Sequence, residues 1–218
     1  MKAIQTSQPA RNTINATHWV VIAFVALCGL TGIMSGYFEI CQGNVPTGGF
    51  QISTIGPAYS MWQHSTYNAV TIIPNFLLSG ILAIAVSLLV IAWAIFFIRK
   101  KYGVIVFILL SALQLFVGGG IVIDLAIITG IVASQIDKPL TWWRVHLSER
   151  MQGILAGLWP WAIVAYALSA LLLLAASIAG VNNSAMMDWI MVDAAIMFGP
   201  IILSIMGAFA RDIRRQNL

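Results

Sequence analysis

The stretch GVIVFILLSALQLFVGGGIVIDLAIITGIVAS, residues 103–134, decides how this chain can fold. A continuous helix of this length would measure about 48 Å at about 1.5 Å per residue. The hydrocarbon core of a bilayer is only about 30 Å thick. We therefore expect a broken or re-entrant segment with its hinge at Gly118, Gly119 and Gly120, because glycine lacks the Cβ atom that restricts backbone turns.

The composition assigns the chain to membrane proteins. Of its 218 residues, 60% are hydrophobic and only 8% are charged, and the mean hydropathy is +0.93. A soluble domain carries roughly 25% charged residues, so this chain has too little polar surface to face water. The net charge of +4 comes from clusters beside apolar runs, which topology and anionic headgroups explain without a nucleic acid.

Apolar runs and turn formers divide the sequence into five hydrophobic segments. We predict an all-α, polytopic membrane helix bundle that forms a single integral membrane domain over residues 1–218. A long loop at 39–70 follows the first segment and carries no charge after Glu39. The expected spans are about 18–38, 72–98, 103–134, 153–179 and 187–210.

The basic residues favour one orientation in the cell membrane. All eleven lie in the N-terminal tail, at 99–101, in the connector 135–152 and in the C-terminal tail. Positively charged loops tend to stay in the cytoplasm. If every cluster is cytoplasmic, the N-terminus is also cytoplasmic and the segment 103–134 must enter and leave the membrane on one side. Five simple spans would instead divide the eleven basic residues almost equally between the two sides of the membrane.

Asp124 is the only charged residue between Lys101 and Asp137. An ionised carboxylate within a membrane costs roughly 2.5–3.5 kcal/mol on insertion scales, so such residues are paired, protonated or functional. Asp124 is therefore a candidate proton or cation site, with Gln114 as a polar neighbour. Asp193, in the last span, is a second and shallower candidate. The alternative is that these groups only join helices by hydrogen bonds.

The connector DKPLTWWRVHLSER, residues 137–150, predicts a short interfacial helix near 139–150. Leucine, tryptophan and methionine recur on one face, which is typical of a helix lying in the headgroup plane. We expect lipid or partner contacts from Trp142, Trp143, Arg144 and Arg150.

The string RNTINATHW, residues 11–19, is followed by LTG at 30–32. This pattern resembles the first helix of membrane cytochrome b subunits, in which a histidine followed by tryptophan opens a span and ligates haem. The resemblance implies His18 as a haem ligand and, if the basic clusters share one face, His146 as its axial partner. Di-haem members use four histidines within spans, whereas this chain has three at span edges or in loops. The alternative is that the histidines are interfacial residues beside belt tryptophans.

Catalytic and metal signatures do not occur in the sequence: there is no H-E-x-x-H, G-x-S-x-G, C-x-x-C or P-loop. The small number of intramembrane charges suits a packing subunit better than an ion pathway. We therefore expect a non-catalytic integral membrane subunit or anchor of a larger complex, with lipids and other membrane subunits as partners. The first alternative is a small transporter or channel that uses Asp124 on a broken helix. A redox anchor that binds haem b or quinone is a more distant one.

Overall fold

The computed structural model describes residues 15–55, 68–120, 123–179 and 184–216. Within these ranges, the side chains of 123–124, 173, 176–179 and 184–196 lie outside the description. The fold is all-α apart from one short strand pair, β1 (Gln51–Ser53) and β2 (Asn68–Val70), which is antiparallel. Its helices are α1 (Ala16–Gln42), α2 (Phe76–Phe96), α3 (Gly103–Phe116), α4 (Ile123–Ala133), α5 (Thr141–His146), α6 (Glu149–Ala179) and α7 (Ser184–Gln216).

Three helices of the described chain are long and apolar enough to cross a membrane: Ala16–Gln42, Phe76–Phe96 and Glu149–Leu172. They are compatible with a membrane location, but they do not confirm the predicted count of five segments. In place of the third segment, the structure has two shorter helices, α3 and α4, of 14 and 11 residues. The helix α7 runs for 33 residues and carries the polar sequence RDIRRQ at its end.

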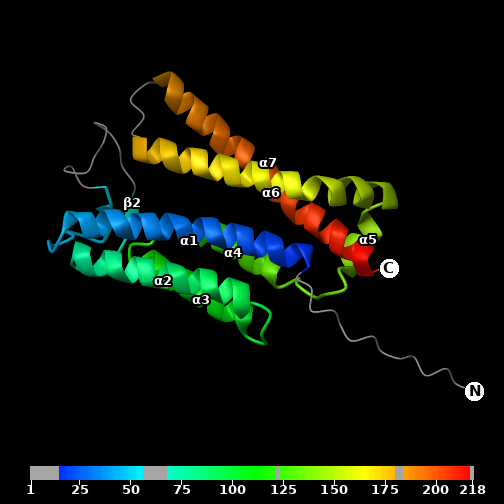
Figure 1. Cartoon of the computed structure of the whole chain (residues 1–218), viewed down its shortest axis with the longest axis horizontal. Helices are drawn as coiled ribbons and strands as arrows, with labels where there is room; N and C mark the ends of the chain where they lie inside the picture. Colours follow the sequence, from blue (N-terminus) through cyan, green and yellow to red (C-terminus); the bar gives the residue numbers. More distant parts are fainter. Residues whose placement is uncertain (1–14, 56–67, 121–122, 180–183, 217–218) are drawn as a thin grey trace, which may run out of the picture.

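Helices α1 and α2 lie side by side along most of their length (Figure 1). Glycines make this close packing possible. A Cβ atom on Gly36 would lie 2.5 Å from the carbonyl oxygen of Gly80, and a Cβ atom on Gly80 would in turn collide with the carbonyl of Gly36. Gly157 on α6, in contrast, has nothing near its Cβ position. Gly36 thus forms part of a close helix interface, whereas Gly157 does not.

The chain turns back between α3 and α4. Helix α3 ends at Phe116 and α4 begins at Ile123, with Gly118 and Gly120 at φ +91° and +85°. The start of α3 and the end of α4 lie at the same end of the molecule, where Arg99 pairs with Asp137 at 2.8 Å. The segment is therefore a hairpin, which we call the α3–α4 hairpin.

The tip of the hairpin pairs with the last residue of β2 and with the two residues that follow it. The amide of Ile72 donates to the carbonyl of Phe116, and the amide of Gly118 donates to the carbonyl of Val70, both at 2.9 Å. Thr71 and Val117 form an antiparallel bridge. Irregular backbone at membrane depth requires such partners within the protein. The predicted loop 39–70 thus begins later, because Glu39 and Gln42 still belong to α1, and it supplies β-structure to the hairpin tip.

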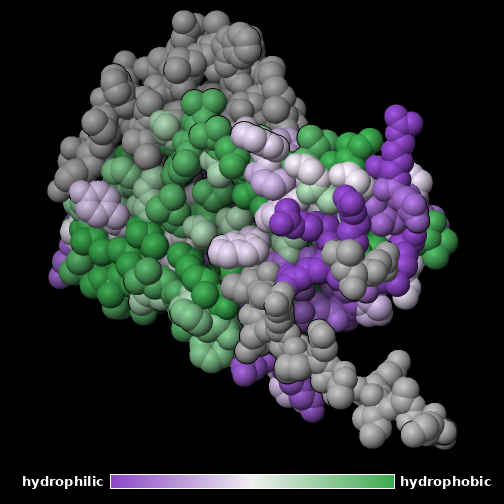
Figure 2. Space-filling view, turned by 45° about the vertical axis from the view of Figure 1, so that its right-hand side comes forward, coloured by the Kyte–Doolittle hydropathy of each residue, from purple (hydrophilic) through white to green (hydrophobic). Residues whose placement is uncertain are grey.

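The basic residues of the described chain gather at one end of the molecule. Direct contacts join this end: Asn15 and Arg99 both bind Asp137, while Gln216 binds the carbonyl of Lys138 and the side chain of Arg144. Figure 2 shows hydrophilic residues concentrated there and an apolar surface beside them. We call it the basic end. The remaining members are Lys100, Lys101, Arg150, Arg211, Arg214 and Arg215.

The predicted interfacial helix near 139–150 is shorter than expected. Helix α5 covers only Thr141–His146, and Glu149 and Arg150 already belong to α6. The sequence shows no helix-breaking proline or glycine between His146 and Glu149. The break arises at Leu147, which leaves helical geometry with an extended backbone and buries its side chain.

Candidate functional site

The candidate site is a buried carboxyl group at the hairpin tip, opposite the basic end. Glu39 lies in the last turns of α1, and none of its surface is exposed. About 21 residues separate it from His18 near the start of the helix, which corresponds to roughly 30 Å along the axis. Glu39 directly follows the predicted span 18–38 and was not among the candidate residues.

Polar groups from four segments surround the Glu39 carboxyl. The hydroxyl of Ser35, one turn earlier, lies 3.4 Å from Oε1 and donates a 2.6 Å hydrogen bond to the carbonyl of Gly118. The hydroxyl of Ser79 on α2 lies beside the carboxyl and donates to the carbonyl of Val117 at 3.1 Å. The Thr71 hydroxyl is 2.8 Å from that of Ser79. We call Ser35, Glu39, Thr71 and Ser79 the Glu39 cluster.

Gly118 explains why the hairpin breaks where it does. Its φ of +91° suits glycine, and its missing side chain leaves space for the carboxyl. A Cβ atom at Gly118 would lie 2.6 Å from Glu39 Oε2 and 2.8 Å from Ser79 Oγ, and would also collide with Oε1. The glycine thus has two roles, a left-handed turn and direct contact between backbone and carboxyl.

The Glu39 carboxyl has unused hydrogen-bonding capacity. Its Oε2 atom is buried and has no hydrogen-bond partner in the described ranges 15–55, 68–120, 123–179 and 184–216. Burial of an ionised carboxylate with no cation beside it costs several kcal/mol. A protonated carboxyl avoids most of that cost and can also donate a hydrogen bond. The arrangement therefore suits a carboxyl that takes up and releases a proton.

A second polar position lies deeper, where the hairpin faces α1 and α2. Gln114 is buried and donates to the carbonyl of Cys28 at 3.2 Å. A Cβ atom on Gly32 would collide with the Gln114 amide and with the Ser87 hydroxyl, and it would lie 3.2 Å from the carbonyl oxygen of Gly119. Among the described residues, Ser87 Oγ has no hydrogen-bond partner. Polar groups thus continue inward from the Glu39 cluster.

Beyond this position the interior is mainly apolar, since the buried Ser111 and Thr129 hydroxyls there donate to carbonyls of their own helices. Val21, Val25 and Val90 are almost fully buried, in one hydrophobic cluster with Phe107 and Phe209. Polar groups return at the basic end, where Asp212 of α7 accepts hydrogen bonds from the amides of Ala16 and Thr17 and from the Thr17 hydroxyl, at 2.6–2.9 Å. The apolar layer separates the two polar regions.

The two predicted intramembrane aspartates lie in helices whose side chains are not described at these positions. Asp124 belongs to the first turn of α4 and Asp193 to α7, but both side chains lie outside the described residues. Gln114, the expected neighbour of Asp124, is placed and is buried. The hinge glycines Gly118, Gly119 and Gly120 lie between α3 and α4.

The two histidines proposed as haem ligands have separate protein partners. His18 is buried, and its Nε2 atom lies 3.0 Å from the carbonyl oxygen of Ala94. His146 is exposed, stacks on Trp142 with ring centroids 4.2 Å apart and contacts the Trp142 carbonyl through Nδ1. Within the described part of the chain, no group of three or more metal-binding side chains occurs.

The four expected interfacial residues differ in their surroundings. Trp142 is 60% exposed, and Arg150 is exposed on α6. Trp143 turns inward, with its ring centroid 5.4 Å from that of Phe209. Arg144 donates to Gln216 Oε1 at 3.0 Å. Helix α5 is thus held against α7 by one face and leaves Trp142 at the surface.

The sequence did contain a signal for Glu39. Gly32, Ser35, Gly36 and Glu39 recur at helical spacing, so they share one face of α1. A face of small and polar residues that ends in an acid indicates close packing around a buried carboxyl.

No protein-family model, curated protein or solved structure matches this chain.

Proposed function

We propose that the protein moves protons in the membrane, as a small transporter in which Glu39 is the proton-binding group. One observation carries the proposal: the carboxyl of Glu39 is buried against a broken helix with one oxygen unpartnered among the described residues. Intramembrane acids commonly mark proton or ion pathways. Glu39 replaces Asp124 in the transporter hypothesis because its surroundings are described.

The packing around Glu39 favours a proton over a metal ion. Both carboxyl oxygens lie against the Gly118 backbone, and the Ser35 and Ser79 hydroxyls already donate to backbone carbonyls. A metal ion would need these oxygens to point at a shared centre, as oxygen ligands do around hard cations. A proton needs no such set of ligands, and a single hydroxyl, that of Ser35, lies 3.4 Å from Oε1.

Thr71 gives the proton a route toward the loop end. It lines a cavity of about 520 Å³ with Pro46, Phe50 and Pro74, and its hydroxyl lies 2.8 Å from that of Ser79. The cavity, Thr71, Ser79 and Glu39 therefore form a series in which a proton passes between hydroxyl groups. The apolar layer at Val21, Val25 and Val90 closes the other direction. Such one-sided access is typical of a transporter that alternates between two states and not of an open channel.

Infrared spectroscopy of the reconstituted protein tests the proton site without a known substrate. A change of pH should alter the C=O band of a buried carboxylic acid in the native chain and in Glu149→Gln. Glu149 is an exposed acid at the basic end, so it controls for the loss of one carboxyl. Glu39→Gln should remove the pH-dependent band. Identical spectra for the native chain and Glu39→Gln would overturn the assignment of Glu39.

Transport itself is measured in proteoliposomes that contain a pH-sensitive dye. A potassium diffusion potential should acidify the lumen with native protein and with Glu149→Gln, but not with Glu39→Gln. If native protein moves no more protons than empty vesicles at either sign of the potential, the transport proposal fails even where the infrared result stands.

A subunit or anchor of a larger complex is the second candidate function, and the surface of α6 favours it. This helix packs mainly on α7, and its opposite face exposes large apolar side chains. Trp161 and Leu168 are 73% and 63% exposed. Such a face suits a neighbouring helix as well as lipid. Purification in mild detergent decides the matter, because a lone 23.7 kDa species without co-purifying polypeptides would contradict the subunit hypothesis.

A further inference from the structure

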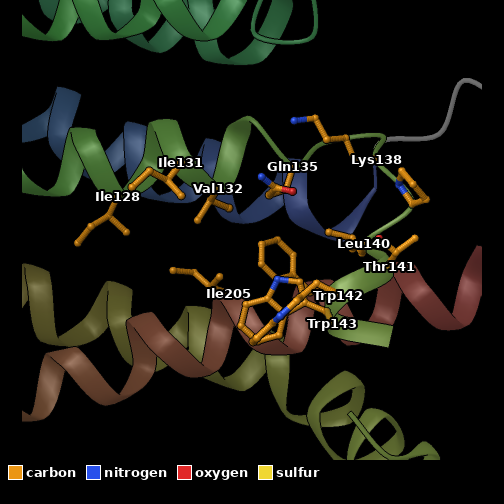
Figure 3. A pocket seen from close by; sticks show the side chains of 12 residues that line it. Ile128, Ile131, Val132, Gln135, Lys138, Leu140, Thr141, Trp142, Trp143 and Ile205 are labelled. Carbon is orange, nitrogen blue, oxygen red and sulfur yellow. The ribbon is translucent and has the colours of Figure 1, made fainter. Parts of the chain in front are cut away.

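An open slot runs between α4 and α7 at the basic end. These two helices both pack on α1, and α5 closes the space between them at one end (Figure 3). The cavity volume is about 530 Å³, within the usual range for small-molecule sites. Ile131, on the wall formed by α4, is 62% exposed, so the slot opens sideways toward the surrounding lipid. We call it the α4–α7 slot.

The chemistry of the slot changes along its length. Aliphatic side chains of α4 and α7 face each other across it, and Figure 3 shows Ile205 opposite Ile131 and Val132. Gln135, Lys138 and Thr141 belong to the end near α5, with the indoles of Trp142 and Trp143 at the boundary. Figure 3 shows the exposed Lys138 side chain along the outer side of this end, so its flexible stem has to turn inward to reach a headgroup there. Tryptophans take this boundary position at membrane interfaces. Along the slot, the apolar wall is followed by the indoles and then by the lysine and threonine. This order matches that of a lipid from its acyl chain to its headgroup.

The polar end of the slot is fixed in place by the fold. Gln216 of α7 joins it to the C-terminal helix through the carbonyl of Lys138, at 3.1 Å. Asp137 and Leu140, on either side of Lys138 and Pro139, have φ values of +61° and +47°. Non-glycine residues rarely adopt this conformation, and strained backbone of this kind clusters at ligand clamps. The turn holds Lys138 beside the slot.

The charge of the slot favours an anionic ligand. Asp137, the acid closest in sequence to Lys138, is already paired with Arg99, so it does not offset the Lys138 ammonium group. Arg144, also exposed, follows on α5. Polybasic surfaces of this kind attract the anionic lipids of the cytoplasmic leaflet.

We propose that the α4–α7 slot binds one anionic phospholipid, with an acyl chain between α4 and α7 and its phosphate at Lys138. The apolar wall confers no preference between lipids, because the bilayer is equally apolar. Selectivity comes from Lys138. A basic residue near an anionic surface contributes about 1 kcal/mol, which corresponds to about a fivefold preference for an anionic over a zwitterionic headgroup.

Native mass spectrometry with added lipid tests the site. The purified chain is titrated with phosphatidylglycerol and phosphatidylcholine of identical acyl chains. We expect one tightly retained phosphatidylglycerol, with a preference that Lys138→Gln lowers about fivefold. Lys100→Gln removes the same charge from the same end but outside the slot, and it should behave as the native chain does. Equal effects of the two variants would overturn the role of Lys138.

Filling the slot tests its occupant. Ile205→Trp and Ile131→Trp introduce bulk from opposite walls, and each should abolish retention of both lipids while the helical circular dichroism stays unchanged. Because Ile131 is exposed, its position can accept a larger side chain without unfolding the protein. The test therefore remains decisive if Ile205→Trp fails to fold. Undiminished lipid retention in a folded Ile131→Trp protein would overturn the proposal, as would a quinone or a polypeptide found in place of the phospholipid.

Discussion

The carboxylate of Asp212 accepts a 2.6 Å hydrogen bond from the hydroxyl of Thr17, 195 positions earlier in the chain. The same carboxylate accepts from the amides of Ala16 and Thr17, which belong to the first turn of α1 and have no partner within the helix. An acid is favourable at a helix N-terminus because it faces the positive end of the helix dipole. Asp212 thus joins the C-terminal helix to the start of the chain's first helix.

Asp212→Ala should destabilise the protein by about 2 kcal/mol or more, because three buried donors lose their acceptor. The measurement is the free energy of unfolding in mixed detergent micelles. Asp137→Asn serves as the control, since its pair with Arg99 is exposed and such pairs contribute about 1 kcal/mol or less. Equal losses for the two variants would contradict the capping role of Asp212.

Gly118→Ala should cost about 3 kcal/mol or more, through backbone strain at positive φ and collision with Glu39. Gly48→Ala separates these two effects. Gly48 has a positive φ of +73° but nothing within 4 Å of its Cβ position, so only the strain of about 1–2 kcal/mol applies. The two free energies of unfolding are compared directly. A difference of zero between them would show that the carboxyl does not pack on Gly118.

Gly32→Ala and Gly157→Ala should change stability in opposite directions. A methyl group at Gly32 meets Gln114 and Ser87, and overpacking of this kind costs about 1–3 kcal/mol. Gly157 is an exposed helical position without close neighbours, so alanine should stabilise α6 there by roughly 0.5–1 kcal/mol. Thermal unfolding in detergent measures both shifts. Destabilisation by Gly157→Ala would indicate a contact on α6 that the structure does not include.

Cysteine labelling in intact cells should place the loop end and the basic end on opposite sides of the membrane. In a chain carrying Cys28→Ala and Cys41→Ser, a membrane-impermeant maleimide should modify Val45→Cys but not Lys100→Cys or Arg214→Cys. The last two should react only after the membrane is opened, because positively charged loops stay in the cytoplasm. Labelling of Lys100→Cys and Arg214→Cys from different sides would contradict the shared basic end.

The length of segment 103–134 was enough to anticipate that its helix would not run straight, and the three glycines indicated where it would stop. The sequence could not show that the tip pairs with residues 70–72, because that pairing depends on a loop with no apolar periodicity. The number of spans was harder to predict. Hydropathy counts apolar residues, so it does not separate one long helix from two short helices of the same composition.

The site was predicted only in part. Gln114 was selected as a polar neighbour and is buried, but the carboxyl described near the hairpin is Glu39. Its position at the end of α1 suggested solvent exposure, since an acid there usually marks the edge of a span. Its burial depends on Ser79 of α2 and on the Gly118 backbone, which no spacing in the sequence links to it. The α4–α7 slot likewise depends on helices that are far apart in sequence.

The pairing of the hairpin tip with residues 70–72 also matters while the chain is being made. Residues 70–72 are synthesised some 45 positions before the tip residues 116–118 with which they pair. The backbone groups of the tip are satisfied only when those residues have reached them. A chain whose first loop cannot reach the tip would therefore leave the polar backbone between α3 and α4 without these partners.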